Sequence, residues 1–362
     1  MRNMIVSANQ LVAGCIVTAD VMGKSGLPLI KSKTILTDTE VFYLRKLLVK
    51  EVTVASHLSD GSTFIPKEES FVSNPDTITE VHFLDAYAEA IEGYQKHFHT
   101  WQHGGAVDIP LHRNHILPVL EKVRKWDGNV FNLPAYREQS DYLPEHAAGT
   151  AALVAAVLQR ANFPEADIKQ IGLAAFLADC GMSKLKQPYH IQKRRLHDKD
   201  LVDVQRHPTL SYRMVEDASI LSSKAKLAIL QHHEQADGTG YPLRLTKEKI
   251  HPFASLLSIC DTYHALISNR PYQAAVSPYE AVDIILKEQF KRFDPVMIKH
   301  FIQAFVDAQQ NTKVRLSTGE IAEVVFTDNN HPARPMVREG QTGQVKALKD
   351  MPHIRITEII SR

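Results

Sequence analysis

The sequence predicts a mainly helical protein with a small α+β unit at its start and a short β cap at its end. Three patterns indicate this. Apolar residues recur at helical spacing between residues 141 and 311, whereas short β-branched runs between turn residues fill 1–56 and 312–362. Residues 57–140 join a stretch rich in Ser, Asp and Pro to two amphipathic helices. We therefore expect domain boundaries near residues 56, 140 and 311.

Composition limits the classes of protein that this chain can belong to. With 362 residues and 44% hydrophobic content, it is long enough for two or three domains with buried cores. A formal charge of +1 provides no field that would gather nucleic acid or an acidic membrane. No apolar run approaches the ~20 residues of a membrane span. The cysteines are odd in number and widely spaced, and no signal-peptide pattern precedes them, so we expect reduced thiols and a cytoplasmic location.

The predicted elements before residue 141 are short strands and three helices. Strands are expected at 5–6, 15–17, 27–30 and 52–54. Thr37 and Glu40 fit a capping box at the start of a helix that carries Phe42, Leu44, Leu47 and Leu48. Residues 57–79 are expected to be a linker, followed by helices from residue 81 and around 116–126. This first unit fits either a signal-sensing role or a plain packing role.

The predicted elements after residue 141 are helices and then strands. Helices are expected at 147–158, 168–177, 201–215, 222–233, 253–267 and 278–287, with another that starts at Asp294-Pro295. Strands are expected at 314–316, 321–325, 336–337 and 354–360.

Several His and Asp residues interrupt the apolar pattern of these helices. His232 and His233 end a predicted helix, and Asp261 lies within a run of Leu, Ile and Cys. A buried charge costs several kcal/mol unless it is paired or bound to metal. His146, Asp179 and His207 complete a set of six. Each residue alone also fits an ordinary structural role, but together these imidazoles and carboxylates suit Fe, Mn, Zn or Ni.

The stretch around the paired histidines carries a family resemblance. It contains His232-His233-Glu234, Asp237-Gly238 and Gly240-Tyr241-Pro242, and it is followed by Ile259-Cys260-Asp261 and Asn269-Arg270-Pro271-Tyr272. With these motifs, residues 141–305 resemble the HD-GYP family. The resemblance implies an HD-type helical bundle, and a metal-dependent phosphodiesterase that hydrolyses cyclic di-GMP to pGpG or GMP.

The resemblance also implies an arrangement of the site. His146, Asp179 and Asp261 would hold one metal, His207, His232 and His233 would hold a neighbour, and Asp179 would bridge the two. Iron or manganese would be the metal, as one or two ions. Arg270 would bind a phosphate of the nucleotide. Tyr241 would lie beside the nucleotide or plug the loop.

The chain departs from the family pattern at three positions. Ala178 stands where the family has the first histidine of its His-Asp pair, Met182 where it has a lysine, and Gln273 where a basic residue is usual. Cys180 lies beside this gap and could in principle replace the missing histidine as a ligand. We do not expect this, because neighbouring residues on a helix point about 100° apart.

Three hypotheses follow from these departures. The first is a cyclic di-GMP regulator or receptor with weak or no turnover. The second is a working phosphodiesterase with an altered site, and the third is a non-catalytic scaffold. We favour the first, and we expect cyclic di-GMP or a related nucleotide, a homodimer and a signalling partner protein, without nucleic acid or a membrane span.

Overall fold

The chain divides after Asn74 into two units, Met1–Asn74 and Pro75–Arg362. The structure is a computed structural model. It describes residues 3–22, 28–37, 40–41, 44, 49, 51–64, 66, 75–126, 130–136, 141–192, 197–270, 273–340 and 342–361.

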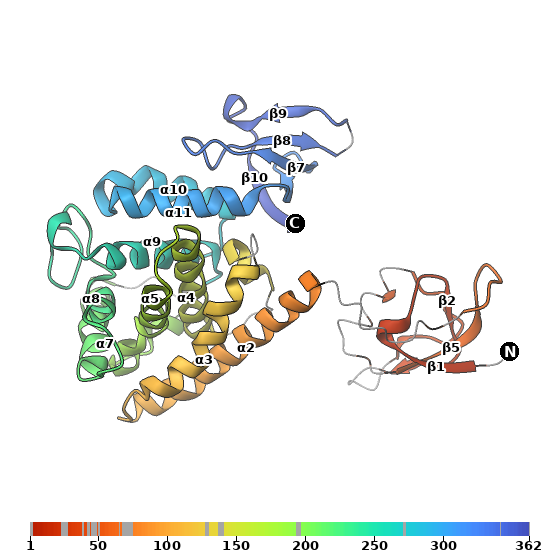
Figure 1. The fold of residues 1–362 in the computed structure, drawn as a ribbon, viewed down its shortest axis with the longest axis horizontal. Helices are drawn as coiled ribbons and strands as arrows, with labels where there is room; N and C mark the ends of the chain where they lie inside the picture. The colour runs from red at the N-terminus through yellow and green to blue at the C-terminus, as the bar shows by residue number, and fades with distance from the viewer. Residues whose placement is uncertain are drawn as a thin grey trace. The chain divides into compact units, whose positions relative to one another are not determined.

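A three-stranded antiparallel sheet organises the first unit (Figure 1). Strand β5 (Glu51–Leu58) lies between β1 (Asn3–Ser7) and β2 (Cys15–Val17), and β3 (Val21–Met22) pairs with β4 (Pro28–Ile30). Buried Val6, Val17 and Val54 belong to its core. The predicted strands are therefore confirmed. So is the capping box, in which the Thr37 and Glu40 amides each donate to the other residue's side chain. Of the helix predicted after it, Phe42, Leu47 and Leu48 lie outside the described residues.

Helices make up most of the second unit, which confirms the predicted fold class (Figure 1). They are α2 (Pro75–Gln102), α3 (Ile109–Lys122), α4 (Tyr142–Arg160), α5 (Glu165–Leu177), α6 (Asp198–Val204), α7 (His207–Val215), α8 (Ser223–Gln231), α9 (Pro252–Ile267), α10 (Pro278–Arg292) and α11 (Pro295–Gln309). Helix α4 is the centre of the bundle because α2, α3, α5, α9 and α11 all pack against it. Its Ala-rich run is buried from His146 to Leu158, since small side chains allow neighbouring helices to approach on every side.

Two predictions about helix limits were wrong. Residues 75–79, expected to be linker, form the start of α2. Residues 201–215, expected to be one helix, divide into α6 and α7. Pro208 explains the division, because it has no N–H to continue the ladder of α6 but is well tolerated in the first turn of a new helix. His207 consequently occupies the first position of α7.

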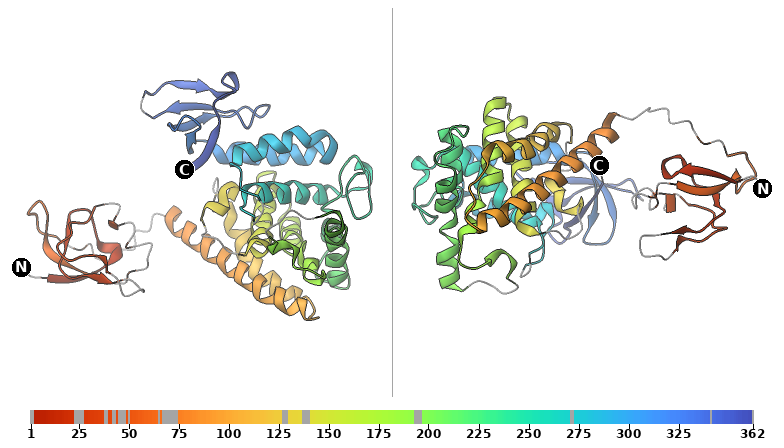
Figure 2. Two further views of the ribbon diagram at one scale, coloured as in Figure 1. Left: turned by 180° about the vertical axis from the view of Figure 1, so that it is seen from behind. Right: turned by 90° about the horizontal axis from the view of Figure 1, so that it is seen from below.

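An antiparallel sheet, blue in Figure 2, forms the β cap. Its five strands follow the order β10-β6-β7-β8-β9. These strands are β6 (Lys313–Leu316), β7 (Ile321–Phe326), β8 (Met336–Glu339), β9 (Val345–Ala347) and β10 (Ile356–Ser361). Four were predicted and β9 was not. Gly319, at a φ of +89°, makes the turn between β6 and β7. The sheet packs on α10, where the Ser277 hydroxyl donates to the Ile356 carbonyl at 2.8 Å.

Candidate metal centre

Five segments of the helical unit bring the six predicted ligand residues together. His146 lies in the first turns of α4, Asp179 follows α5, and His207 begins α7. His232 caps the C-terminus of α8 with His233 next to it, and Asp261 lies within α9. Most of these side chains lie where a helix begins or ends. Asp179 leaves the α5 helix at φ −100° and ψ 8°, where a short 3-10 helix (Cys180–Lys184) begins.

The first cluster consists of His146, Asp179 and Asp261. The Nε2 atom of His146 lies 2.7 Å from Asp261 Oδ1 and 3.8 Å from Asp179 Oδ2. One ligand atom from each of the three residues lies within 4.8 Å of the others. Because His146 is buried and both carboxylates are largely buried, water does little to screen these charges.

The second cluster contains the same aspartate together with His207, His232 and His233. Asp179 Oδ1 lies 3.1 Å from His207 Nε2 and 3.9 Å from His232 Nε2. The ring of His233 lies against that of His232, with 4.1 Å between ring centroids. Asp179 is therefore common to both clusters, with one carboxylate oxygen facing each.

The proton positions in the second cluster fit a bound cation. His207 Nδ1 lies 2.7 Å from the Val204 carbonyl oxygen, and His232 Nδ1 lies 2.7 Å from that of Ile229. Since a carbonyl only accepts, each neutral ring carries its proton on Nδ1 and turns a bare Nε2 inward. These two Nε2 atoms are 3.3 Å apart and both face Asp179. Three such acceptors repel one another unless a proton or a metal cation lies among them, and the second case is the usual environment of metal-binding histidines.

The same histidines keep the carboxylates ionised. Burial alone would raise the pKa of Asp179, but the contact with His207, followed by the charges of His232 and His146, holds this pKa well below its ordinary value. Burial is likewise outweighed at Asp261, where contact with His146 comes first among the groups that lower the pKa to about 2. Burial lowers the pKa of His232 and His233, with the neighbouring imidazoles adding to it. Both carboxylates and both rings are thus in the protonation states that bind metal.

A cavity of about 210 Å³ opens beside the two clusters. His146, Asp179, Asp261 and Arg270 are among its lining residues. The Arg270 guanidinium lies over the Tyr142 ring at 5.2 Å, a cation–π contact that holds a positive charge at the cavity.

Tyr241 also lines this cavity, and it belongs to a loop that Glu234 holds in place. The Tyr241 ring lies 4.8 Å from that of His233. The buried Glu234 carboxylate accepts from the Leu243 and Leu245 amides at 2.6 and 2.8 Å. A Cβ atom at Gly240 would come within 2.3 Å of the Gln235 nitrogen, so the loop requires glycine there.

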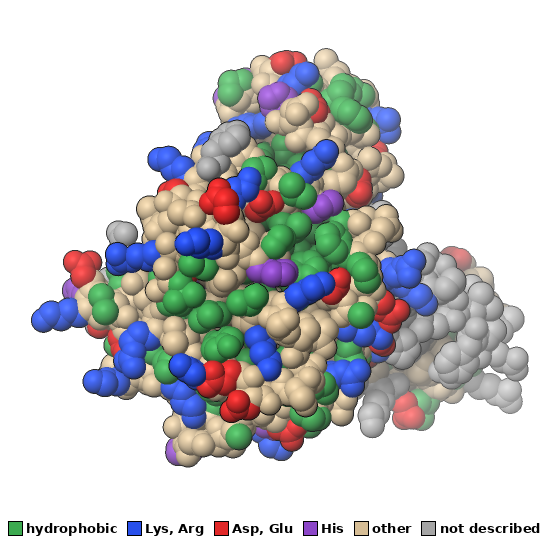
Figure 3. Space-filling view, turned by 60° about the vertical axis from the view of Figure 1, so that its left-hand side comes forward, with side chains coloured by type: hydrophobic (Ala, Val, Ile, Leu, Met, Phe, Trp, Pro, Cys, Tyr) green, Lys and Arg blue, Asp and Glu red, His purple; other side chains and the backbone are tan. Residues whose placement is uncertain are grey.

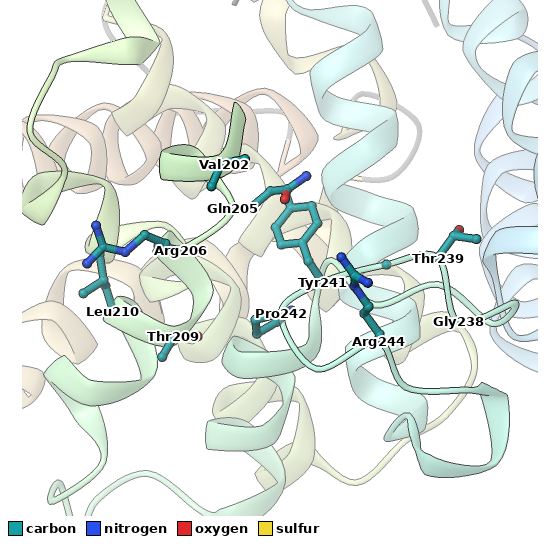
Figure 4. A pocket seen from close by; sticks show the side chains of 11 residues that line it. Val202, Gln205, Arg206, Thr209, Leu210, Gly238, Thr239, Tyr241, Pro242 and Arg244 are labelled. Atoms are coloured by element: carbon teal, nitrogen blue, oxygen red, sulfur yellow. The ribbon is translucent and has the colours of Figure 1, made fainter. Parts of the chain in front are cut away.

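A second, wider pocket of about 670 Å³ is also lined by Tyr241 (Figure 4). Arg206 and Arg244 line it, together with Gln205 of the turn between α6 and α7. Because Tyr241 lines both hollows, the wider pocket adjoins the cavity at the two clusters. On the face drawn in Figure 3, by contrast, basic and acidic side chains are interspersed, in keeping with the near-zero net charge.

The residues at the departures from the family pattern lie as follows. Ala178 is buried at the end of α5, and its methyl group has no ligand atom. Met182 lines the cavity without a charge. The Cys180 thiol faces the Ser211 carbonyl, and burial raises its pKa to about 12, so it is a poor substitute ligand. Gln273 is exposed, and its backbone pairs with that of Arg270.

Two residues of the site were not predicted from sequence. His264 is fully buried, and its Nδ1 lies 3.2 Å from that of His146. Tyr142 stacks on His146, with its hydroxyl 3.3 Å from the same Nδ1. Both therefore contact the ring nitrogen that faces away from Asp261 and orient that imidazole. His264 follows Asp261 by three residues on α9, a spacing that could have drawn attention to it.

Comparison with known proteins places this site in a family context. Residues 134–297 match the HD domain family. The chain is 28% identical over 235 residues to a cyclic di-GMP phosphodiesterase of Pseudomonas aeruginosa, and the aligned region covers 65% of this chain and 56% of that protein. It is 26% identical over 207 residues to the cyclic di-GMP phosphodiesterase PdeB of Borreliella burgdorferi, covering 57% of this chain and 54% of that one. It thus spans about half the length of these curated relatives. A solved HDG"Y"P protein from Bdellovibrio bacteriovorus aligns with a TM-score of 0.47 and 14% identity, covering 83% of this chain and 98% of that chain.

Proposed function

We propose that the protein acts in cyclic di-GMP signalling as a regulator or receptor with weak or no turnover, starting from the match of residues 134–297 to the HD domain family. Its metal centre would bind cyclic di-GMP or a related cyclic dinucleotide. The observation that carries this proposal is the carboxylate of Asp179, which faces both ligand clusters at the edge of a cavity.

The ligand sets support a centre for one or two divalent ions. His146, Asp179 and Asp261 would hold one ion, and Asp179, His207, His232 and His233 the other. Mixed imidazole and carboxylate ligands suit iron or manganese, which we propose as the metal. When bound, such ions neutralise phosphate charge and lower the pKa of water.

Side chains around the cavity supply the contacts for a nucleotide. Arg270 presents a planar fork of donors that matches a phosphate, and its stacking on Tyr142 limits the freedom it would lose on binding. Tyr241 offers an aromatic face between the cavity and the wider pocket. A dinucleotide that extends past Tyr241 would meet Arg206 and Arg244.

The departures from the family pattern support weak turnover. Loss of one ligand, at Ala178, would cost roughly a hundredfold in metal affinity. Loss of a positioned cation, at Met182, would cost about 10²–10³ in rate. Lys184 is no replacement, because its Nζ donates to the Trp101 carbonyl at 2.5 Å. If the two losses are independent they multiply, to about 10⁴ or more.

A working phosphodiesterase is the second candidate, and the convergence of all six ligands favours it. A pure scaffold is disfavoured, because buried carboxylates that hold nothing would destabilise the fold. A homodimer, a signalling partner protein and a cytoplasmic location stay predictions. In the described part of the chain, no helix has both the length and the apolar character to cross a bilayer.

One experiment separates these candidates. The full chain is purified without oxygen, its metals are counted, and cyclic di-GMP binding and turnover are measured with added Mn²⁺ or Fe²⁺. Binding without turnover is the expected result. If the wild type turns over cyclic di-GMP and Asp179→Ala abolishes this activity, the protein is a phosphodiesterase instead. If the protein binds neither metal nor cyclic di-GMP, the scaffold hypothesis is the one that stands.

A gain-of-function variant tests the reason given for weak turnover. Restoring both family residues, as Ala178→His with Met182→Lys, should raise the rate of cyclic di-GMP hydrolysis. The measurement is the initial rate at saturating Mn²⁺, with the single variants as controls. An unchanged rate in a double variant that holds its metals would contradict the geometry assigned to these positions.

A further inference from the structure

A second group of histidines lies on the hairpin of α2 and α3, apart from the six ligands described above. His97 comes from α2, and His112 and His115 lie three residues apart on one face of α3. One ring nitrogen from each residue lies within 4.8 Å of one from each of the others. Ring centroids are 4.9 Å apart for His97 and His112, and 5.8 Å apart for His97 and His115.

The close approach of the two helices at this point depends on a glycine. A Cβ atom at Gly93 would lie 2.2 Å from His115 Nδ1, so the ring of His115 reaches α2 only because no side chain is there. His97 Nδ1 lies 2.6 Å from the Gly93 carbonyl oxygen, which can only accept. The neutral His97 ring therefore carries its proton on Nδ1 and leaves its Nε2 bare.

His112 is the residue that ordinary packing does not explain. It is fully buried between Trp101 and Phe176, and neither of its ring nitrogens has a hydrogen-bond partner among the described residues. The Nδ1 of His115 is also buried and unpartnered within the same set. Leaving buried ring nitrogens unpaired is costly, and a core position would be filled more stably by an apolar side chain.

Burial keeps His112 in the form that binds metal. Together with the neighbouring His97 and His115, it lowers the pKa of this imidazole to about 3. Three imidazoles turned toward one another resemble the protein ligands of a tetrahedral zinc site, whose fourth position is filled by water.

We propose that His97, His112 and His115 bind a divalent zinc ion on the α2–α3 hairpin, at a site distinct from the centre that Asp179 shares. Bound zinc would accept the lone pairs that the fold leaves without partners. Zinc suits this site better than iron or manganese because its ligands are all nitrogen, with no carboxylate in the cluster.

Zinc counting in the full chain tests this site separately from the HD centre, by which we mean the two clusters that share Asp179. The His97→Ala/His115→Ala variant removes two ligands, and the His99→Ala/His103→Ala variant removes two exposed histidines near the end of the same hairpin. After equilibration at one buffered level of free Zn²⁺, bound zinc is measured by mass spectrometry. We expect the first variant to hold one zinc ion fewer per chain than the wild type, and the control variant to match the wild type.

Folding is checked by circular dichroism in chelator, where both variants should match the wild type. If the first variant does not fold, His97→Gln changes one half-buried ligand and should weaken the tightest zinc site outside the HD centre by at least tenfold. Equal zinc counts in the wild type and the folded double variant, or equal affinity in His97→Gln, would overturn the proposal.

Discussion

Replacing the shared carboxylate provides the sharpest test of the metal centre. Asp179→Asn keeps the shape of the side chain but removes its charge and turns an amide toward bare ring nitrogens. The two carboxylate oxygens of Asp179 lie 3.1 Å from His207 Nε2 and 3.8 Å from His146 Nε2, so one substitution damages both clusters. If a four-ligand site contributes about 10–16 kcal/mol, one ligand accounts for roughly 3 kcal/mol, or about a hundredfold in affinity.

The assay is a titration of metal-free protein with Mn²⁺, followed by metal counting after buffer exchange. Asp261→Asn is the matched control, because Asp261 is equally buried but belongs to the first cluster alone. We expect Asp179→Asn to weaken every Mn²⁺ site of the HD centre about a hundredfold, and Asp261→Asn to spare the His207 and His232 site. Wild-type affinity in Asp179→Asn would refute the reasoning that this carboxylate is shared.

Three further predictions concern the surroundings of the site and the rest of the bundle. Arg270→Ala should weaken cyclic di-GMP binding about tenfold to a hundredfold in calorimetry without changing the metal count, since it removes charge-assisted hydrogen bonds worth about 1.5–3 kcal/mol; an unchanged Kd would contradict its assigned role. Gly149→Ala places a Cβ atom 1.9 Å from His264 Nε2. Thermal unfolding should therefore show a free energy of unfolding lower by about 1–3 kcal/mol, and titration should show weaker metal binding at the first cluster. Wild-type behaviour in both measurements would count against a fixed His264. His251 Nδ1 accepts from the Phe253 amide at the start of α9, and burial lowers the pKa of His251. This capping hydrogen bond contributes about 1 kcal/mol to the free energy of unfolding. The contribution is complete above the ordinary histidine pKa near 6.5, and it is lost as the pH falls from there toward the lower pKa of His251 in the folded protein. His251→Asn should flatten that part of the pH dependence in urea unfolding, and an identical slope in both proteins would exclude the cap as its source.

Much of the helical unit could be predicted because its signals are local. Periodic apolar residues indicated α4, α5 and α9, and Asp294-Pro295 marked the start of α11, where the Asp294 carboxylate accepts from the Val296 and Met297 amides. The division at Pro208 was also readable in principle, since a proline has no N–H to continue a helix but fits the first turn of a new one. The strand β9 was missed because its three residues, Val345-Lys346-Ala347, include only one residue type that favours strands, whereas the equally short β2 reads Cys-Ile-Val.

The candidate site shows the same contrast between local pattern and packing. Asp261 drew attention because an acidic residue amid buried Leu and Ile must have a partner, and the partner lies 115 positions away, at His146. No spacing along the chain specified that partner. Tyr142 and His264 escaped notice for the same reason, because their importance comes from contacts with His146 rather than from any motif.

The sequence by itself determined the helical class, most element positions and the chemical types of the six predicted ligand residues, because these depend on periodicity and on the cost of burying charge. Only the tertiary structure decided that one carboxylate faces two clusters, that His264 orients His146, and that three histidines of α2 and α3 meet over Gly93. Such convergence depends on how helices pack across long separations, where the gap between two backbones, set by a single glycine or a run of alanines, decides which side chains touch.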